Sequence, residues 1–131
     1  MITDATEGGL FFMVRRKADI RIRTVENAQG GEGKVTFEDW LLPQEAPGHG
    51  RVFSRLVIPP GASIGYHGHN GEFEAYVVLS GEAFVDDNGE EVVLHEGDMH
   101  MCKDGDGHST KNASDKDLVL MALIMNTLEN G

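Results

Sequence analysis

Two histidines and a glutamate lie close together in one short stretch of the chain, GASIGYHGHNGEFEAYVVLSG, residues 61–81. His67 and His69 are two positions apart, so in an extended chain both imidazoles point to the same side. Glu74 opens an apolar run in which Tyr76 and Val78 share its side. A carboxylate on such a face is costly to bury unless a cation offsets its charge. Imidazole nitrogen and carboxylate oxygen together suit Mn, Fe, Co, Ni, Cu or Zn.

These three residues alone are weak evidence for a metal, because a His-x-His pair on a strand is usually a pair of solvated histidines. The elements around them are short strands. Apolar or alternating runs separated by glycine, proline and an Asn-Gly turn predict strands at 18–26, 35–42, 51–58, 74–79, 82–86, 90–94, 98–102 and 118–125. Short strands at even intervals predict one all-β domain, a sandwich or a barrel.

A second segment strengthens the metal hypothesis. Residues 97–112 read GDMHMCKDGDGHSTKN, and together the two segments resemble the two sequence motifs of the cupin superfamily. The first motif is matched by Gly61, His67, His69, Glu74 and Gly81, and the second by Gly97, Gly105, His108 and Asn112. All spacings agree, and Lys103 stands where the second motif has a proline. The resemblance covers residues 61–112.

The resemblance implies a double-stranded β-helix, or jelly roll, built from one cupin unit. It also implies that one divalent transition metal ion (Mn, Fe, Ni, Co, Cu or Zn) is bound inside the barrel by His67, His69, Glu74 and His108. Residues 35–126 would form the barrel, 1–34 an N-terminal arm and first strand, and 127–131 a C-terminal tail.

Other side chains near these motifs are weaker candidates for the metal site. His100 and Cys102 share one face of their predicted strand, and the sequence leaves open whether that face or the opposite one lines the interior. Glu72 is expected at the barrel mouth. The remaining expectations are a packing role for Tyr66 and Tyr76, solvated His49 and His95, and core positions rather than cofactor-ligand roles for the six methionines.

The composition of the chain limits the classes of molecule that it is expected to bind. The formal net charge is −11, which disfavours nucleic acid and anionic membranes. The single cysteine excludes an internal disulfide, and the first residues lack a signal-peptide pattern, so a cytoplasmic protein is expected. The apolar residues Leu10, Phe11, Phe12, Ile20 and Ile22 lie in residues 9–25, and they predict a homodimer in which this arm packs on the partner's sheet.

Three functions are compatible with these features. Four protein ligands on an ion that prefers six leave two positions for water, dioxygen or a bidentate oxygen ligand. The favoured hypothesis is therefore a metal-dependent enzyme of the dioxygenase, decarboxylase, isomerase or lyase type that acts on a small oxygen-rich metabolite such as a sugar acid or keto acid. The alternative is a non-catalytic module that binds a small molecule or metal. A purely structural cupin ranks last, because it has little use for a complete ligand set.

Overall fold

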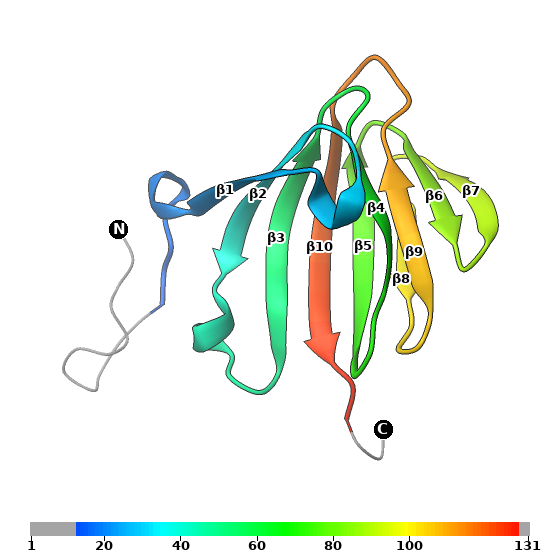
Figure 1. Cartoon of the computed structure of the whole chain (residues 1–131). Coiled ribbons are helices and arrows are strands. Elements are labelled where there is room, and N and C mark those ends of the chain that lie inside the picture. The colour runs from blue at the N-terminus through cyan, green and yellow to red at the C-terminus, as the bar shows by residue number, and fades with distance from the viewer. Residues whose placement is uncertain (1–12, 129–131) are drawn as a thin grey trace.

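The computed structural model describes residues 13–128, which form ten strands joined by turns and short 3-10 segments (Figure 1). The all-β prediction is confirmed. No helix in this part of the chain is long and apolar enough to cross a membrane.

Six strands form the larger sheet, in the order β1-β2-β3-β10-β5-β8. Every neighbouring pair is antiparallel. The strands are β1 (Arg21–Glu26), β2 (Lys34–Leu41), β3 (Gly50–Ile58), β10 (Leu118–Asn126), β5 (Glu72–Ser80) and β8 (Met99–Cys102). The central strands β3, β10 and β5 are the longest, and their alternating burial gives the sheet one buried face.

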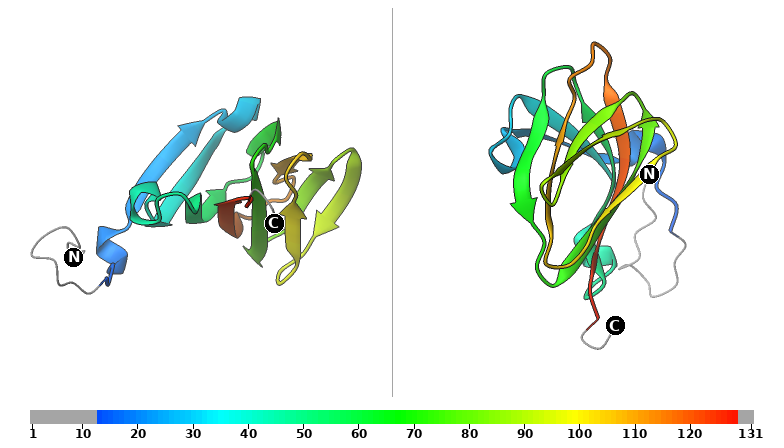
Figure 2. Two further views of the ribbon diagram at one scale, coloured as in Figure 1. Left: turned by 90° about the horizontal axis from the view of Figure 1, so that it is seen from below. Right: turned by 90° about the vertical axis from the view of Figure 1, so that its right-hand side faces the viewer.

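Four strands form the smaller sheet, in the order β4-β9-β6-β7. They are β4 (Ser63–Gly68), β9 (Gly107–Lys111), β6 (Ala83–Asp87) and β7 (Glu90–Leu94). The two sheets face each other around a shared core that includes Leu56, Val78 and Leu120 from one sheet and Val85 from the other (Figure 2). This is the expected double-stranded β-helix.

The two strands that the sequence pattern missed are β4 and β9. Both are rich in glycine, histidine and hydroxyl side chains and poor in the β-branched and aromatic residues that mark a strand. They exist because they pair with each other, with His67 opposite His108. Long-range pairing of this kind leaves no local periodicity in the sequence.

A tight turn forms before β9 although the motif's proline is absent. The amide of Asp106 donates to the carbonyl of Lys103 at 3.0 Å, and Gly105 has a φ of +93° at the third turn position. That geometry is a type II turn, which needs a positive φ at this position but no proline at its first residue. The Gly105 amide also donates to the His69 carbonyl at 2.7 Å, so the turn is joined to the first motif.

The β1–β2 hairpin reaches across to the smaller sheet. Its connecting 3-10 segment η2 (Ala28–Gly30) lies against β4, and a Cβ on Gly65 would be 2.2 Å from the Gln29 carbonyl oxygen. Only glycine allows the two backbones to approach this closely. The hairpin therefore closes the side of the barrel next to β4.

The face of β1 that looks toward the barrel is not its apolar one. Arg23 and Val25 are half-buried, whereas Ile22 is 66% exposed. The sequence predicts an exposed apolar arm, and Ile22 is apolar and exposed on the outer surface. Its packing on a partner stays a prediction. Residues Leu10, Phe11 and Phe12 of the same prediction lie outside the described residues.

The expectation of core methionines is wrong for most of those described. Met99 is 60% exposed and Met101 is 42% exposed, because His100 and Cys102 take the inward positions of β8. Met101 lies opposite Ala75, and Met99 opposite Val77, on the outer face of the larger sheet. The methionines thus contribute to an apolar surface that the described residues do not cover.

Candidate metal centre

Three histidines and one glutamate converge inside the barrel from both sheets. The cluster consists of His67 on β4, His69 just after it, Glu74 on β5 and His108 on β9. One potential ligand atom from each lies within 4.8 Å of all the others. The cross-strand pairing of His67 with His108 and the facing position of β5 bring together residues that are far apart in the sequence.

The shortest contacts in the cluster surround Glu74. Its Oε1 atom lies 2.9 Å from Nε2 of His108 and 3.4 Å from Nε2 of His69, and the two nitrogens are 3.2 Å apart. Glu74, His69 and His108 are all buried. Three lone-pair-bearing atoms this close repel one another unless a proton or a metal cation lies among them. The donor set is therefore compatible with one metal ion.

The other ring nitrogen of each histidine is held by an outer partner. His67 Nδ1 donates to the Gly65 carbonyl at 2.8 Å, and His69 Nδ1 lies 2.9 Å from Glu72 Oε1. His108 Nδ1 lies 3.0 Å from Nε2 of His100. When Nδ1–H donates outward, Nε2 carries the lone pair that faces the cluster, which is the usual arrangement for metal-binding histidines.

Glu72 has a role that sequence reasoning did not foresee. Its side chain is 16% exposed, and its carboxylate joins His69 to Arg51. The Arg51 guanidinium donates from Nε and Nη2 to the two oxygens of Glu72, each at 2.8 Å. These bonds, above all those of Arg51, lower the pKa of Glu72 to about 2. Glu72 thus stays ionised and fixes the orientation of the His69 ring.

The open question about β8 is answered by burial. His100 and Cys102 face the interior at 8% and 0% exposure. His100 supports His108, and burial raises the pKa of the Cys102 thiol to about 11, so this cysteine behaves as a small buried hydrophobe. Tyr76 also packs inside as expected, with its hydroxyl 2.6 Å from that of Thr110.

The charges of the cluster are coupled. Burial alone would raise the pKa of Glu74, but hydrogen bonds from His108 and His69 outweigh it and lower the pKa to about 2. The same contact with Glu74, assisted by Glu72, raises the pKa of His69 above its ordinary 6.5. Burial lowers the pKa of His67. Without a metal, the contact with Glu74 therefore favours the protonated form of the His69 imidazole.

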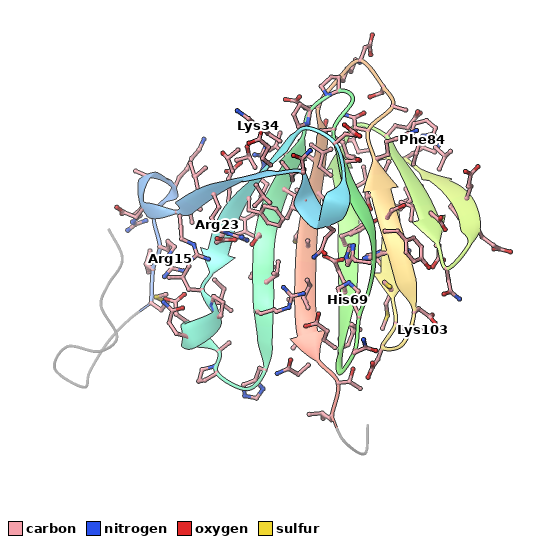
Figure 3. All side chains as sticks on the ribbon, viewed as in Figure 1. Arg15, Arg23, Lys34, His69, Phe84 and Lys103 are labelled. Atoms are coloured by element: carbon pink, nitrogen blue, oxygen red, sulfur yellow. The ribbon has the colours of Figure 1, made fainter. Side chains whose placement is uncertain are left out.

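A cavity of about 190 Å³ opens next to the cluster. It lies between the β1–β2 hairpin and the barrel, and Figure 3 shows Arg23 and His69 on the same side of the larger sheet. The side chains that give the cavity its chemical character are Arg23, Val25, Phe37, Arg51, His67 and Glu74. The cavity therefore joins the candidate metal centre to two guanidinium groups.

The histidines that the sequence ranked as solvated are on the surface. His49 is exposed, and the side chain of His95 is 65% exposed beside Glu82. The sequence analysis missed Arg23 and Arg51. For Arg23 a signal was present, since Arg21, Arg23 and Val25 alternate on β1 against Ile20 and Ile22, but alternation does not say which face turns inward.

Comparison with known proteins agrees with this geometry. A family model described as "Cupin domain" matches residues 54–124, which is more than half of the chain. The chain belongs to the cupin family. An oxalate-binding protein of Thermotoga maritima is 40% identical to this cupin over 70 residues, which are 53% of this chain and 58% of that protein. The match thus spans less than two thirds of the relative's length.

Solved structures extend the comparison to most of the chain. The crystal structure of a predicted oxalate decarboxylase from Thermotoga maritima superposes with a TM-score of 0.82 and 36% identity, covering 88% of this cupin and 100% of that chain. The structure of KdgF from Halomonas sp. has a TM-score of 0.69 at 15% identity and covers 91% of this cupin and 97% of that chain. The latter likeness concerns the fold alone.

Metal binding to this cluster should release protons. Because the pKa of His69 is raised above 6.5, more of this imidazole is protonated near neutral pH than in a free histidine, and a metal must displace that proton. Affinity should therefore fall as the pH falls, starting above pH 6.5. Calorimetric titration of the metal-free protein with Mn²⁺ at pH 7 should show heats that depend on the ionisation enthalpy of the buffer, corresponding to release of up to about one proton per site.

The matched control for proton release is Glu72→Gln. It removes one of the two carboxylates that raise the pKa of His69, so fewer protons should be released. Heats that are the same in all buffers for the wild-type protein would show that the metal-free cluster holds no such proton.

Proposed function

We propose that this cupin binds one divalent transition metal ion through His67, His69, Glu74 and His108, and that the ion binds a small oxygen-rich carboxylate in the adjoining cavity. Oxalate is the first candidate, because the relatives that share 36–40% identity are described as oxalate-binding protein and predicted oxalate decarboxylase. The observation that supports the proposal most strongly is the convergence of four potential ligand atoms, two of them from His67 and Glu74, which line a cavity together with two arginines.

The ligand assignment is supported by the way each side chain is held. Each imidazole has an outer partner on Nδ1, so its ring cannot turn away without losing that bond. Glu74 supplies the negative charge that favours a divalent ion over water in the interior. An ion bound by four protein groups retains positions for ligand oxygens and would polarise a carboxylate there.

The cavity walls favour an anion. Arg51 and Arg23 line the cavity, where Glu74 is the one carboxylate among the described lining residues and is offset by the metal. Glu72 pairs with Arg51, whereas the single charge of Asp39 is shared by Arg23 and Arg21, so one guanidinium charge is left in excess. The rest of the lining is largely apolar, with Val25, Phe37 and neighbouring aliphatic side chains. A small carboxylate therefore enters a site of positive charge with little competing water.

The residues that line the cavity also indicate whether a bound carboxylate would be converted to a product. Apart from the proposed ligands His67 and Glu74, the described residues that line the cavity include no imidazole or carboxyl group to carry a proton. General acid–base catalysis requires such a group within reach of the substrate. The geometry thus favours binding of the carboxylate, and turnover by a metal-dependent enzyme is the second candidate, favoured by the relative described as a predicted oxalate decarboxylase.

We also propose that the protein is a homodimer, as the sequence predicts, with the outer face of the larger sheet as part of the interface. Met99 and Met101 are exposed there beside Val77 and Met121, which are half-buried. A contiguous apolar sheet face of this kind is typical of an interface. The expected packing of residues 1–34 on the partner and a cytoplasmic location, which suits a free Cys102 thiol, belong to the same proposal.

Substitution of the proposed ligands should remove the metal. His69→Ala and His108→Ala should each weaken binding by more than the about 10- to 100-fold that loss of an outer partner costs. Metal content after dialysis, measured by elemental analysis, should fall to a small fraction of the wild-type value. His49→Ala and His95→Ala are the controls and should keep full metal content. Folded His69→Ala and His108→Ala proteins with wild-type metal content would mean that the ion binds elsewhere.

Oxalate should bind to the manganese-loaded protein. At millimolar concentration it should change the relaxation of water protons by bound Mn²⁺, and the effect should be absent from the His108→Ala protein. No change with oxalate, pyruvate or a sugar acid would contradict the carboxylate proposal. Oxalate that is recovered intact after incubation, with and without oxygen, would favour a binding protein, whereas its loss would favour an enzyme.

The dimer should depend on the outer face of the larger sheet. Light scattering at micromolar concentration should give twice the chain mass for the wild-type protein and a smaller value for Met101→Glu, because a buried carboxylate without a partner is costly. Val93→Glu places the same charge on exposed β7 and should remain dimeric. A monomeric wild-type protein would contradict the proposal.

A further inference from the structure

Arg23 is held rigidly by a buried carboxylate outside the metal centre. Asp39 on β2 is only 2% exposed, and its Oδ2 accepts from Arg23 Nε at 2.7 Å while its Oδ1 accepts from Arg23 Nη2 at 3.1 Å. Arg21 and Ser54 also donate to Asp39, at 2.8 and 2.6 Å. Asp39 is therefore fully satisfied by three partners, and its charge is exceeded by that of the two arginines.

One face of the planar Arg23 guanidinium also packs against an aromatic ring. Its Cζ atom lies 4.4 Å from the centre of the Phe37 ring, which is its direct cross-strand neighbour. Stacking on an aromatic ring and a forked bond to a carboxylate together leave a guanidinium little freedom. The remaining edge, which includes Nη1, has no hydrogen-bond acceptor among residues 13–128.

That remaining edge belongs to a side chain that lines the cavity of the candidate metal centre. Arg23 comes from β1 and Phe37 from β2, so this part of the cavity wall lies outside residues 54–124, which match the cupin model. Arg21, which shares Asp39, does not line the cavity. The two arginines thus have the same structural partner, but only Arg23 is placed to contact a bound molecule.

We propose that Arg23 forms an anion subsite that binds the acidic group of the ligand farther from the metal centre, so that, among small hydroxy and keto acids, those with a second acidic group bind more tightly than those without one. This inference rests on the proposed binding of a carboxylate at the metal. A chelating 2-hydroxy or 2-keto acid end faces His67 and Glu74, and the second carboxylate accepts from the free edge of Arg23. A planar guanidinium donates two parallel bonds to a carboxylate, which gives the subsite its geometric selectivity.

Matched ligand pairs test the subsite. Malate and lactate share a 2-hydroxy acid end, as 2-oxoglutarate and 2-oxobutyrate share a 2-keto acid end, and within each pair only the first has a second carboxylate. Binding to the manganese-loaded wild-type protein, measured by calorimetry and water-proton relaxation, should favour the diacid of each pair by about tenfold or more, as a charged hydrogen bond implies. Equal affinity within both pairs would overturn the subsite.

Arg23→Gln and Arg21→Gln are the matched variants. Arg23→Gln should abolish the preference for the diacid within each pair, while metal content remains within about twofold of wild type. Arg21→Gln should keep the preference. An equal loss of the diacid preference in both variants would show that disturbing the Asp39 ion pairs changes the cavity indirectly, and would overturn the role of Arg23.

A second substitution covers the case in which Arg23→Gln does not fold. Arg23→Lys keeps a cation next to Asp39. A single ammonium group cannot pair with Asp39 and also donate two parallel hydrogen bonds to the ligand carboxylate. The diacid preference should fall here too, and its retention would overturn the subsite. A wild-type protein that binds metal but neither acid of either pair would instead contradict the proposed function itself.

Discussion

The buried charge of Glu74 constrains the interior of this barrel. Glu74 is 8% exposed and lies on a strand face that continues with Tyr76 and Val78, both almost fully buried. An ionised carboxylate in such a place needs a cation or several donors within contact distance. His69 and His108 lie within 3.4 Å of it for this reason, and the two motifs of the chain must be brought together to put them there.

Successive shells of backbone and side-chain contacts around the cluster hold those imidazoles in place. Pairing of β4 with β9 aligns His67 with His108, and the Lys103–Asp106 turn is bonded to His69 on both sides. A carbonyl, a carboxylate and a further imidazole then fix the three rings. The outermost shell is Arg51, which anchors Glu72. Each shell uses ordinary hydrogen bonds, and their combined effect is that the lone pairs of three rings face one point.

Much of this could be predicted from the sequence, and the failures have a common cause. Motif spacing identified the four cluster residues, and the strand series identified the fold. The inward or outward choice for β1 and β8 could not be predicted, because alternation fixes two faces but not which one is buried. On β8 the inward face has His100 and Cys102 and the outer one has methionines, contrary to hydrophobicity alone. On β1 an arginine is inward and Ile22 outward, because Asp39 of the next strand supplies the partner.

The distribution of charge links the barrel to its first hairpin. The chain as a whole has a net charge of −11, which repels anions at long range, yet the cavity contains two guanidinium groups. Screening at physiological salt limits the overall repulsion to distances of about 8 Å from surface charges, whereas charges in a partly desolvated cavity act at contact. In the proposed function, selection of an anion is thus a local property of the cavity wall. Part of that wall belongs to β1 and β2, which lie outside the match to the cupin model. In the proposed function, the barrel would supply the metal cluster and the hairpin would determine which acid fits beside it.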